Sequence, residues 1–228
     1  MDITSYAAVS GIRVDVTGRS ESGITAAPSQ VKERPGSQPT QEAVKLAAKL
    51  RARVSDEERI LVFADVAERN GGAVSAWEVA QAMAQSCPGQ VLLIDADVAN
   101  PTLHKRCKVP LKPGFADMVR RGRPETLAIH MADSLAVMPA GTDYDLSSLL
   151  SSAELATVLA ALKKQYRWIV VAAPPALEGA QAGLIASRGD EIVLIVTAGK
   201  SSRRELLAAK RELDGLRAPV VGVAIYRG

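Results

Sequence analysis

The amino-acid sequence predicts a doubly wound, mostly parallel α/β sheet with helices on both faces. Six apolar runs have the length of strands, and they are continuous in Val, Ile and Leu rather than alternating with polar residues. Continuous runs of this kind are typical of strands that are covered on both faces. Helical stretches separate most of the runs, and this alternation favours parallel pairing through helical crossovers.

The predicted elements follow one another without a visible internal repeat. The first is a helix over 42–53 with a broken apolar stripe. The strands are expected over 60–64, 91–94, 135–138, 168–171, 192–196 and 220–225, and the later helices over 76–85, 153–165 and 202–216. Ligands of such sheets bind beyond the carboxyl ends of the strands. We therefore expect chemistry in the loops that begin at Asp65, Asp95 and Ala172.

The first 40 residues differ in composition from the rest. Residues 18–40 are rich in Gly, Ser, Pro and Thr, with almost nothing to bury. A short alternating run, Ile12–Val16, fits a strand or a segment that orders on a partner, although a mobile tail is favoured. The sequence thus predicts a disordered arm or linker over 1–40 and one α/β domain over 41–228.

Composition excludes several classes of protein. The 228 residues carry a net charge of +3, too mild to indicate nucleic acid or acidic lipid as the main partner. Two cysteines and two histidines are too few for a disulfide framework or a metal cluster, so no metal site is expected. The start lacks a secretory signal, and the uncharged stretch 168–177 is too short to span a membrane. A cytoplasmic globular protein without direct membrane insertion is expected.

The segment 91–104, VLLIDADVANPTLH, carries the most chemical information. A buried strand ends there in Asp95 and Asp97, and carboxylates are costly to bury without a role. A metal-water or general-base function is one interpretation. The alternative is that Asp97 simply caps the following turn.

This segment resembles the second aspartate motif (Walker A′) of the bacterial tyrosine kinases that work with capsule and exopolysaccharide exporters. That family belongs to the MinD/ParA-like ATPases with deviant P-loops. The resemblance covers about residues 42–227, and its motifs occur in the family's order, at 112–117, 137–141, 149–152, 166–175, 189–193 and 222–225. It implies a P-loop NTPase-like fold, ATP and Mg²⁺ as cofactors, and Asp95 and Asp97 as catalytic residues.

The sequence departs from this family at the P-loop, G-x-x-x-x-G-K-[ST], which should follow the strand at 60–64. No lysine occurs between Lys49 and Lys105. Gly71 or Gly72 occupies the position of the lysine, and Gly72 or Ala73 occupies the position of the hydroxyl residue. The degenerate loop consists of Asn70, Gly71, Gly72 and Ala73. Without the lysine charge and the hydroxyl, the loop loses its best contacts to the β- and γ-phosphates and the metal.

Further departures lie around this loop. Ser75 and Glu78 have the spacing of a capping box, which would satisfy the amides that a P-loop offers to phosphate. Trp77 either fills the vacated space or belongs to the ordinary core. The family's Asp-Thr-Pro-Pro becomes Ala172–Pro175, so a metal-linked carboxylate is missing, and Tyr226 replaces an Asn often found near adenine.

These departures predict a family member that has kept the fold and lost the ATP site, with no cofactor expected. The predicted function is that of a catalytically degenerate partner or regulator of a membrane polysaccharide co-polymerase in exopolysaccharide or capsule synthesis and export. Contact with the cytoplasmic segment of that membrane protein would hold the chain at the inner face of the membrane. Self-association, or association with a related kinase, is a further expected contact.

Two alternatives stay open. The chain is an active tyrosine kinase or ATPase if a partner supplies the missing groups, with Asp95 and Asp97 acting as base and metal-water ligands. It is a ParA/MinD-like positioning factor if the basic side of the last predicted helix binds DNA. A solvated basic face is favoured over DNA binding, because acidic residues interleave with the basic ones, which are Lys200, Arg203, Arg204, Lys210, Arg211 and Arg217.

Overall fold

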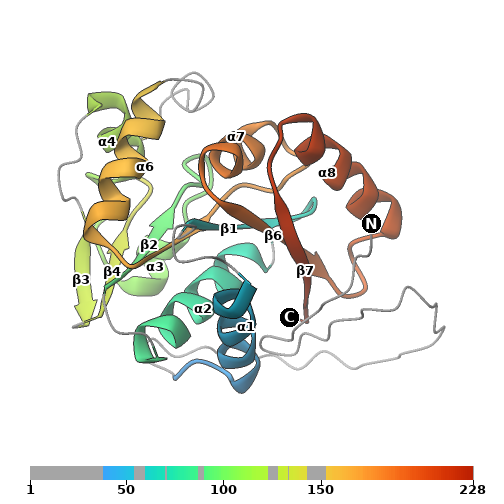
Figure 1. Ribbon diagram of the computed structural model, residues 1–228, viewed down its shortest axis with the longest axis horizontal. Helices are drawn as coiled ribbons and strands as arrows, with labels where there is room; N and C mark the ends of the chain where they lie inside the picture. The colour runs from blue at the N-terminus through green and yellow to red at the C-terminus, as the bar shows by residue number, and fades with distance from the viewer. Residues whose placement is uncertain are drawn as a thin grey trace.

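The structure, a computed structural model, describes residues 38–53, 60–69, 71–86, 90–122, 128–132, 134–142 and 153–227. Within these ranges seven strands form one sheet, in the order β3-β4-β2-β5-β1-β6-β7 (Figure 1). Only β3 runs antiparallel to its neighbour. The strands are β1 (Ile60–Asp65), β2 (Val91–Asp95), β3 (Ile129–Ala132), β4 (Leu135–Met138), β5 (Trp168–Ala172), β6 (Glu191–Thr197) and β7 (Val220–Tyr226).

Helices cover both faces of this sheet (Figure 1). One face carries α1 (Gln41–Arg53), α2 (Gly72–Ser86) and α3 (Leu103–Cys107). The opposite face carries α4 (Phe115–Arg121), α6 (Ala153–Gln165), α7 (Gln181–Arg188) and α8 (Arg203–Gly215). The predicted doubly wound α/β architecture is confirmed. In the described part of the chain, no helix has the length and apolar character needed to cross a membrane.

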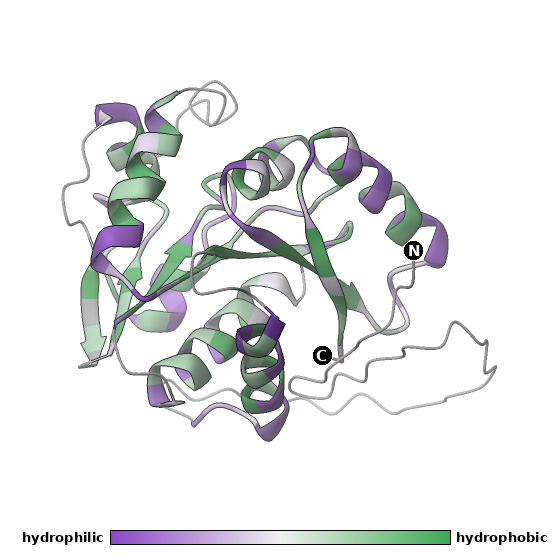
Figure 2. Ribbon diagram, in the orientation of Figure 1, coloured by the Kyte–Doolittle hydropathy of each residue, from purple (hydrophilic) through white to green (hydrophobic). Residues whose placement is uncertain are grey.

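The continuous apolar runs form strands because both faces of the sheet are covered. Successive side chains of a strand point to opposite faces. Accordingly, Ile60 and Val62 pack in the core beneath α4, α6, α7 and α8, whereas Leu61 and Phe63 pack against α1, α2 and α3. Every residue of β1 is buried. Figure 2 shows the strands in green across the middle of the molecule and much of α8 in purple.

The structure extends the predicted element set rather than overturning it. Six predicted strands and four predicted helices are present, with ends that shift by a few residues. The largest shift is at α2, which begins at Gly72 instead of 76, because glycine is a weak helix former and gives no helix signal. The predicted elements omit α3, α4, α7 and β3, which are all short.

The predicted arm over 1–40 lies outside the described residues except for 38–40. The boundary at 41 therefore stays a prediction. Thr40 precedes α1, and its hydroxyl accepts a hydrogen bond from the Ala43 N–H at 3.2 Å. The same hydroxyl donates to the Glu78 carboxylate on α2 at 2.9 Å, so this residue ties the start of α1 to its neighbouring helix.

We expect Leu93→Ala to lower the free energy of unfolding by about 2–5 kcal/mol, because Leu93 is fully buried on β2 and its loss leaves a cavity. Val44→Ala is the matched control, since Val44 is 43% exposed, and it should cost less than about 0.5 kcal/mol. Urea unfolding of both variants measures the difference. Equal losses would contradict the described core.

Candidate functional site

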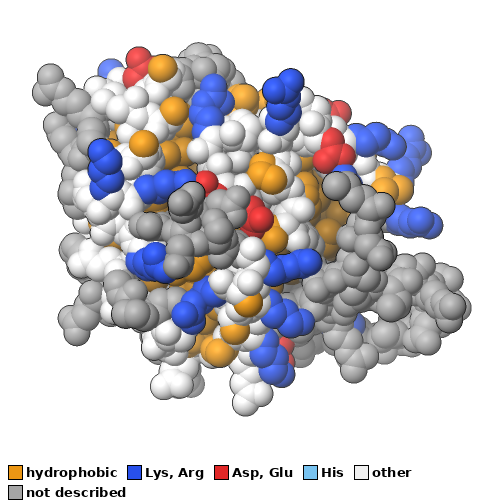
Figure 3. Space-filling model, viewed as in Figure 1, with side chains coloured by type: hydrophobic (Ala, Val, Ile, Leu, Met, Phe, Trp, Pro, Cys, Tyr) orange, Lys and Arg blue, Asp and Glu red, His pale blue; other side chains and the backbone are white. Residues whose placement is uncertain are grey.

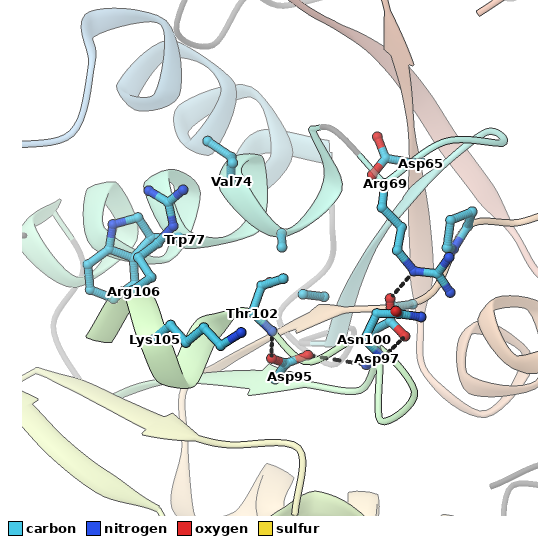
Figure 4. A pocket seen from close by; sticks show the side chains of 14 residues that line it. Asp65, Arg69, Val74, Trp77, Asp95, Asp97, Asn100, Thr102, Lys105 and Arg106 are labelled. Atoms are coloured by element: carbon cyan, nitrogen blue, oxygen red, sulfur yellow. Dashed lines mark hydrogen bonds and ion pairs between the residues drawn. The ribbon is translucent and has the colours of Figure 1, made fainter. Parts of the chain in front are cut away.

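A cavity of about 470 Å³ opens at the carboxyl ends of β1, β2 and β5 (Figure 4). It brings together the starts of the three loops singled out in the sequence, at Asp65, Asp95 and Ala172. Ala172 is paired in register with Asp95 of β2. The position where the kinase family has a carboxylate therefore borders the cavity, but here it carries a methyl group. The lining residues are Asp65, Arg69, Ala73, Val74, Trp77, Asp95, Asp97, Asn100, Thr102, Lys105, Arg106, Ala172, Ala173 and Pro175.

The carboxylate of Asp65 holds the first amides of α2. The Gly71 N–H donates to Asp65 Oδ1 at 3.0 Å, and the Gly72 N–H donates to Oδ2 at 2.9 Å. The Gly71 carbonyl accepts from the Ser75 N–H, so the helix begins at this point. Amides at a helix N-terminus bind anions, including phosphates. In this chain the anion at those two amides is a side chain of the protein itself.

The predicted capping box at Ser75 and Glu78 is wrong. Ser75 lies inside the first turn of α2, and its hydroxyl is buried without a hydrogen-bond partner. The Glu78 carboxylate instead accepts from Thr40. The physical reason is that α2 begins before the pattern indicated, and that the capping carboxylate comes from the preceding strand.

The predicted P-loop residues lie in a tightly packed turn. A Cβ atom on Gly71 would lie 2.6 Å from Tyr226 Cβ and 2.8 Å from Ile195 Cγ2. A Cβ atom on Gly72 would lie 3.0 Å from Asp65 Oδ2. Any side chain at Gly71 thus requires Tyr226 to move. Ala73 borders the cavity, whereas Asn70 lies outside the described residues.

Asp95 is 1% exposed and caps α3. Its Oδ2 accepts hydrogen bonds from the Thr102 and Leu103 N–H groups, both at 2.9 Å, and its Oδ1 accepts from the Asp97 N–H at 3.2 Å. Burial raises the pKa of Asp95 to about 6, although these three hydrogen bonds pull the pKa down. The carboxyl group is thus poised to change charge a little below neutral pH.

Asp97 forms both a turn and an ion pair. Its Oδ1 accepts from the Asn100 N–H at 3.1 Å, which is the turn-capping role left open by the sequence. Its Oδ2 accepts from Arg69 Nε at 2.7 Å, and the Arg69 guanidinium also pairs with Glu178 (Figure 4 shows the Arg69–Asp97 contact). A cation of the chain therefore already faces this carboxylate.

The sequence indicated Asp65 only as the start of a loop, and it gave no indication of Arg69 or of two basic residues of α3 as site residues. Lys105 and Arg106 border the cavity on the side of Trp77 (Figure 4). Trp77 is 8% exposed, so it belongs to the core and also lines the cavity. The sequence signal that could have predicted the capping role of Asp65 is an acidic residue at the end of a strand, followed by a Gly-Gly pair. No local pattern indicates that Arg69 would reach Glu178, because 109 positions separate them.

A magnesium triphosphate held as in a P-loop needs backbone amides that are open to phosphate and side-chain oxygens that bind the metal. Asp65 holds two of the amides that would receive phosphate, and Arg69 faces Asp97. Ala172 and Ala173 offer no side-chain oxygen to a metal. In this arrangement the residues present do not fit that group.

Comparison of the sequence with protein-family models gives no match. Among curated proteins, the tyrosine-protein kinase CpsD of Streptococcus agalactiae is 25% identical over 180 residues, covering 75% of this chain and 76% of CpsD. CapB of Staphylococcus aureus, a candidate tyrosine-protein kinase, is 26% identical over 141 residues, covering 60% of this chain. This chain is a homologue of the bacterial tyrosine-protein kinases.

The chain spans only part of the length of the curated relatives that it matches. The chain spans 62% of CapB and only 18% of EpsB of Ralstonia solanacearum, another candidate tyrosine-protein kinase. The match to EpsB is 26% identical and covers 59% of this chain.

Solved structures of other proteins share this fold. The kinase domain of VpsO superposes with a TM-score of 0.73 at 24% identity, covering 82% of this chain and 93% of that domain. The chimerical protein CapA2B2 also gives 0.73, at 20% identity, covering 86% and 88%. A ParA family ATPase from Chlorobium tepidum gives 0.62 at 16% identity, covering 75% and 74%. At these identities the likeness establishes the fold.

We expect Asp65→Ala to lower the free energy of unfolding by about 1–2 kcal/mol, because the first amides of α2 lose their capping carboxylate. Glu68→Ala is the matched control in the same loop. The Glu68 side chain is 59% exposed, and its removal should change stability by no more than about 0.5 kcal/mol. Chemical denaturation compares the two variants. A loss at Asp65 no larger than that at Glu68 would contradict the capping role.

The raised pKa of Asp95 makes a pH-dependent contribution to stability. Since the folded chain binds this proton more tightly than the unfolded chain, the contribution is present below about pH 4 and is lost as pH rises through about 6. The difference amounts to about 3 kcal/mol. The gap in unfolding free energy between the wild type and Asp95→Asn should shift by roughly that amount between pH 4 and 7. Parallel pH profiles would contradict the raised pKa.

Proposed function

We propose that this homologue of the bacterial tyrosine-protein kinases is catalytically degenerate and works by protein contact. Its role is that of a partner or regulator of a membrane polysaccharide co-polymerase in exopolysaccharide or capsule synthesis and export. The observation that carries the proposal is the Asp65 carboxylate on the Gly71 and Gly72 amides. These amides open the helix that follows β1, where a P-loop would receive phosphate.

The negative charge of Asp65 supports the proposed loss of ATP binding. Asp65 is 6% exposed, and its two oxygens accept from the two amides at 3.0 and 2.9 Å. A triphosphate at the same amides would meet a carboxylate of like charge, which is unfavourable in a partly buried site. The phosphate would first have to expel Asp65 and leave it without these hydrogen bonds, at a further cost.

Missing groups support the same conclusion. A P-loop lysine neutralises the β- and γ-phosphates, and a hydroxyl residue binds Mg²⁺. The chain has Gly71, Gly72 and Ala73 in that region, and the space for a side chain at Gly71 is filled by Tyr226. At Asp97 the positive charge comes from Arg69 instead of a metal.

The kind of partner is supported by the resemblance to kinases that work with capsule and exopolysaccharide exporters. Several homologues are tyrosine-protein kinases, and one structural neighbour is the chimerical protein CapA2B2. A fold that has lost its nucleotide still offers surfaces for protein contact. We place the chain in the cytoplasm, at the inner face of the membrane, through the cytoplasmic segment of such a co-polymerase.

A second candidate function is an active tyrosine kinase or ATPase that a partner completes. The observation in its favour is Asp95, whose pKa of about 6 suits a general base near neutral pH. Asp95 and Asp97 both border the cavity. The partner would have to supply a lysine and a metal-binding oxygen, and Asp65 would have to leave the α2 amides. Asp95→Ala would then abolish turnover.

Isothermal titration calorimetry with ATP and ADP, in the presence of Mg²⁺, tests the proposed loss of the nucleotide site. We expect no heat of binding and no ATP hydrolysis from the folded wild-type chain, because Asp65 occupies the phosphate-binding amides. Thermal unfolding of the same sample controls for the folded state. Binding at micromolar nucleotide would contradict the proposal. Turnover that Asp95→Ala removes would support the second candidate instead.

Titration with the cytoplasmic segment of a candidate polysaccharide co-polymerase tests the proposed partner. We expect a complex whose affinity is unchanged by nucleotide, because the contact does not depend on the ATP site. The control is Asp65→Ala, which alters the degenerate loop and should leave this affinity within about twofold if the contact lies elsewhere on the chain. Reconstitution without any complex would contradict the partner role.

A further inference from the structure

The outward side of α8 combines three arginines with an exposed leucine. Arg203, Leu207 and Arg211 are spaced four residues apart and therefore lie along one side of the helix. Arg204 lies seven residues, or about two turns, before Arg211 and therefore on nearly the same side of the helix as Arg211. All four side chains are exposed, and Leu207 is 44% exposed. Figure 3 shows basic and hydrophobic side chains together over α8, at the right-hand edge of the molecule.

The other charges of α8 differ from these arginines because most of them are already engaged. Glu205 accepts from the Ser202 N–H and hydroxyl at the start of the helix, and Lys210 pairs with Asp214 at 2.6 Å. Glu212 lies five residues after Leu207, which places it about 140° around the helix from that side chain. Among the described residues, no hydrogen bond or ion pair reaches the side chains of the three arginines, Arg203, Arg204 and Arg211.

The four side chains frame a shallow hollow of about 370 Å³. The opposite side of α8 is fixed to the domain through Ala209 and Leu213, which are buried in the core. The hollow is therefore carried by a rigid element, and its apolar floor is surrounded by positive charge. Arginine is enriched at protein interfaces, where its planar guanidinium can form two parallel hydrogen bonds to one carboxylate.

We propose that this surface, formed by Arg203, Arg204, Leu207 and Arg211, docks an acidic peptide segment that carries an apolar side chain. Carboxylates of the partner would pair with the arginines, and the apolar side chain would cover Leu207. This inference rests on the proposed function in one respect, which is that the chain acts through a protein partner. It adds the place of the contact and its chemistry.

The apolar floor favours a peptide over a nucleic acid. A phosphate backbone would pair with the arginines but would leave Leu207 without an apolar partner. Nucleic-acid affinity depends on the neutralisation of many phosphates, and this surface offers three cations. An anionic membrane surface would attract the arginines as well, but the exposed apolar area is a single side chain, which is too little for stable insertion.

The test is fluorescence anisotropy with the full chain and a labelled short peptide of Asp and Glu residues around one Leu. A second peptide with Ser in place of that Leu isolates the apolar contact. Arg203→Glu/Arg211→Glu should weaken binding of the first peptide by about tenfold or more, and Leu207→Ser by about threefold or more. The charge-matched control is Arg53→Glu/Lys164→Glu, because both residues are exposed and lie on other helices. It should leave the affinity within about twofold.

Each outcome decides the inference. Binding of the Leu peptide that is lost in the α8 variants and kept in the control supports it. Equal binding of the Leu and Ser peptides, equal losses in all variants, or no binding of the Leu peptide would overturn it. Retention of duplex DNA or of phosphatidylserine vesicles in preference to the peptide, abolished by the α8 variants, would overturn it in favour of those ligands. None of these results changes the nucleotide titration, so failure here is distinguishable from failure of the proposed loss of ATP binding.

Discussion

The contact between Asp65 and the first amides of α2 determines how the carboxyl edge of the sheet is arranged. Because one carboxylate accepts from both Gly71 and Gly72, the strand β1 and the helix α2 are joined directly at this edge. Just before α2, Gly71 lies against Tyr226 of the edge strand β7. We propose that the negative charge of Asp65 closes a site that would otherwise attract phosphate.

Other carboxylates of the chain, which are buried or partly buried, also accept hydrogen bonds from backbone amides. Asp95 accepts from the Thr102 and Leu103 amides at the start of α3. Asp117 accepts from the Gly114 and Thr142 amides, and Asp190 accepts from the Ile60 amide at the start of β1. A carboxylate at the end of a strand is therefore not a sufficient sign of catalysis, because backbone amides alone can satisfy it.

The sequence was enough for the fold because the fold depends on continuous apolar runs and on their order. Each run became a strand covered on both faces. The motif order indicated the resemblance to bacterial tyrosine kinases, although no family model matches. The candidate site was harder to predict from the sequence. The Ser75–Glu78 spacing gave a wrong capping box, because the start of α2 depends on Asp65, a residue outside the local pattern. The ion pairs of Arg69 with Asp97 and Glu178 join residues that are far apart in the chain. The spacing of apolar residues in the sequence does not predict such contacts. Asn70, also assigned to the degenerate loop, lies outside the described residues, so its part in the loop stays a prediction.

The central claim is that Asp65 keeps anions away from the α2 amides. The most direct measurement follows the amide resonances of Gly71 and Gly72 by ¹⁵N NMR during addition of ATP and Mg²⁺, in the wild type and in Asp65→Ala. We expect both resonances to stay unmoved in the wild type, and a response at millimolar nucleotide in Asp65→Ala only. Shifts of both resonances in the wild type at micromolar nucleotide would contradict the account.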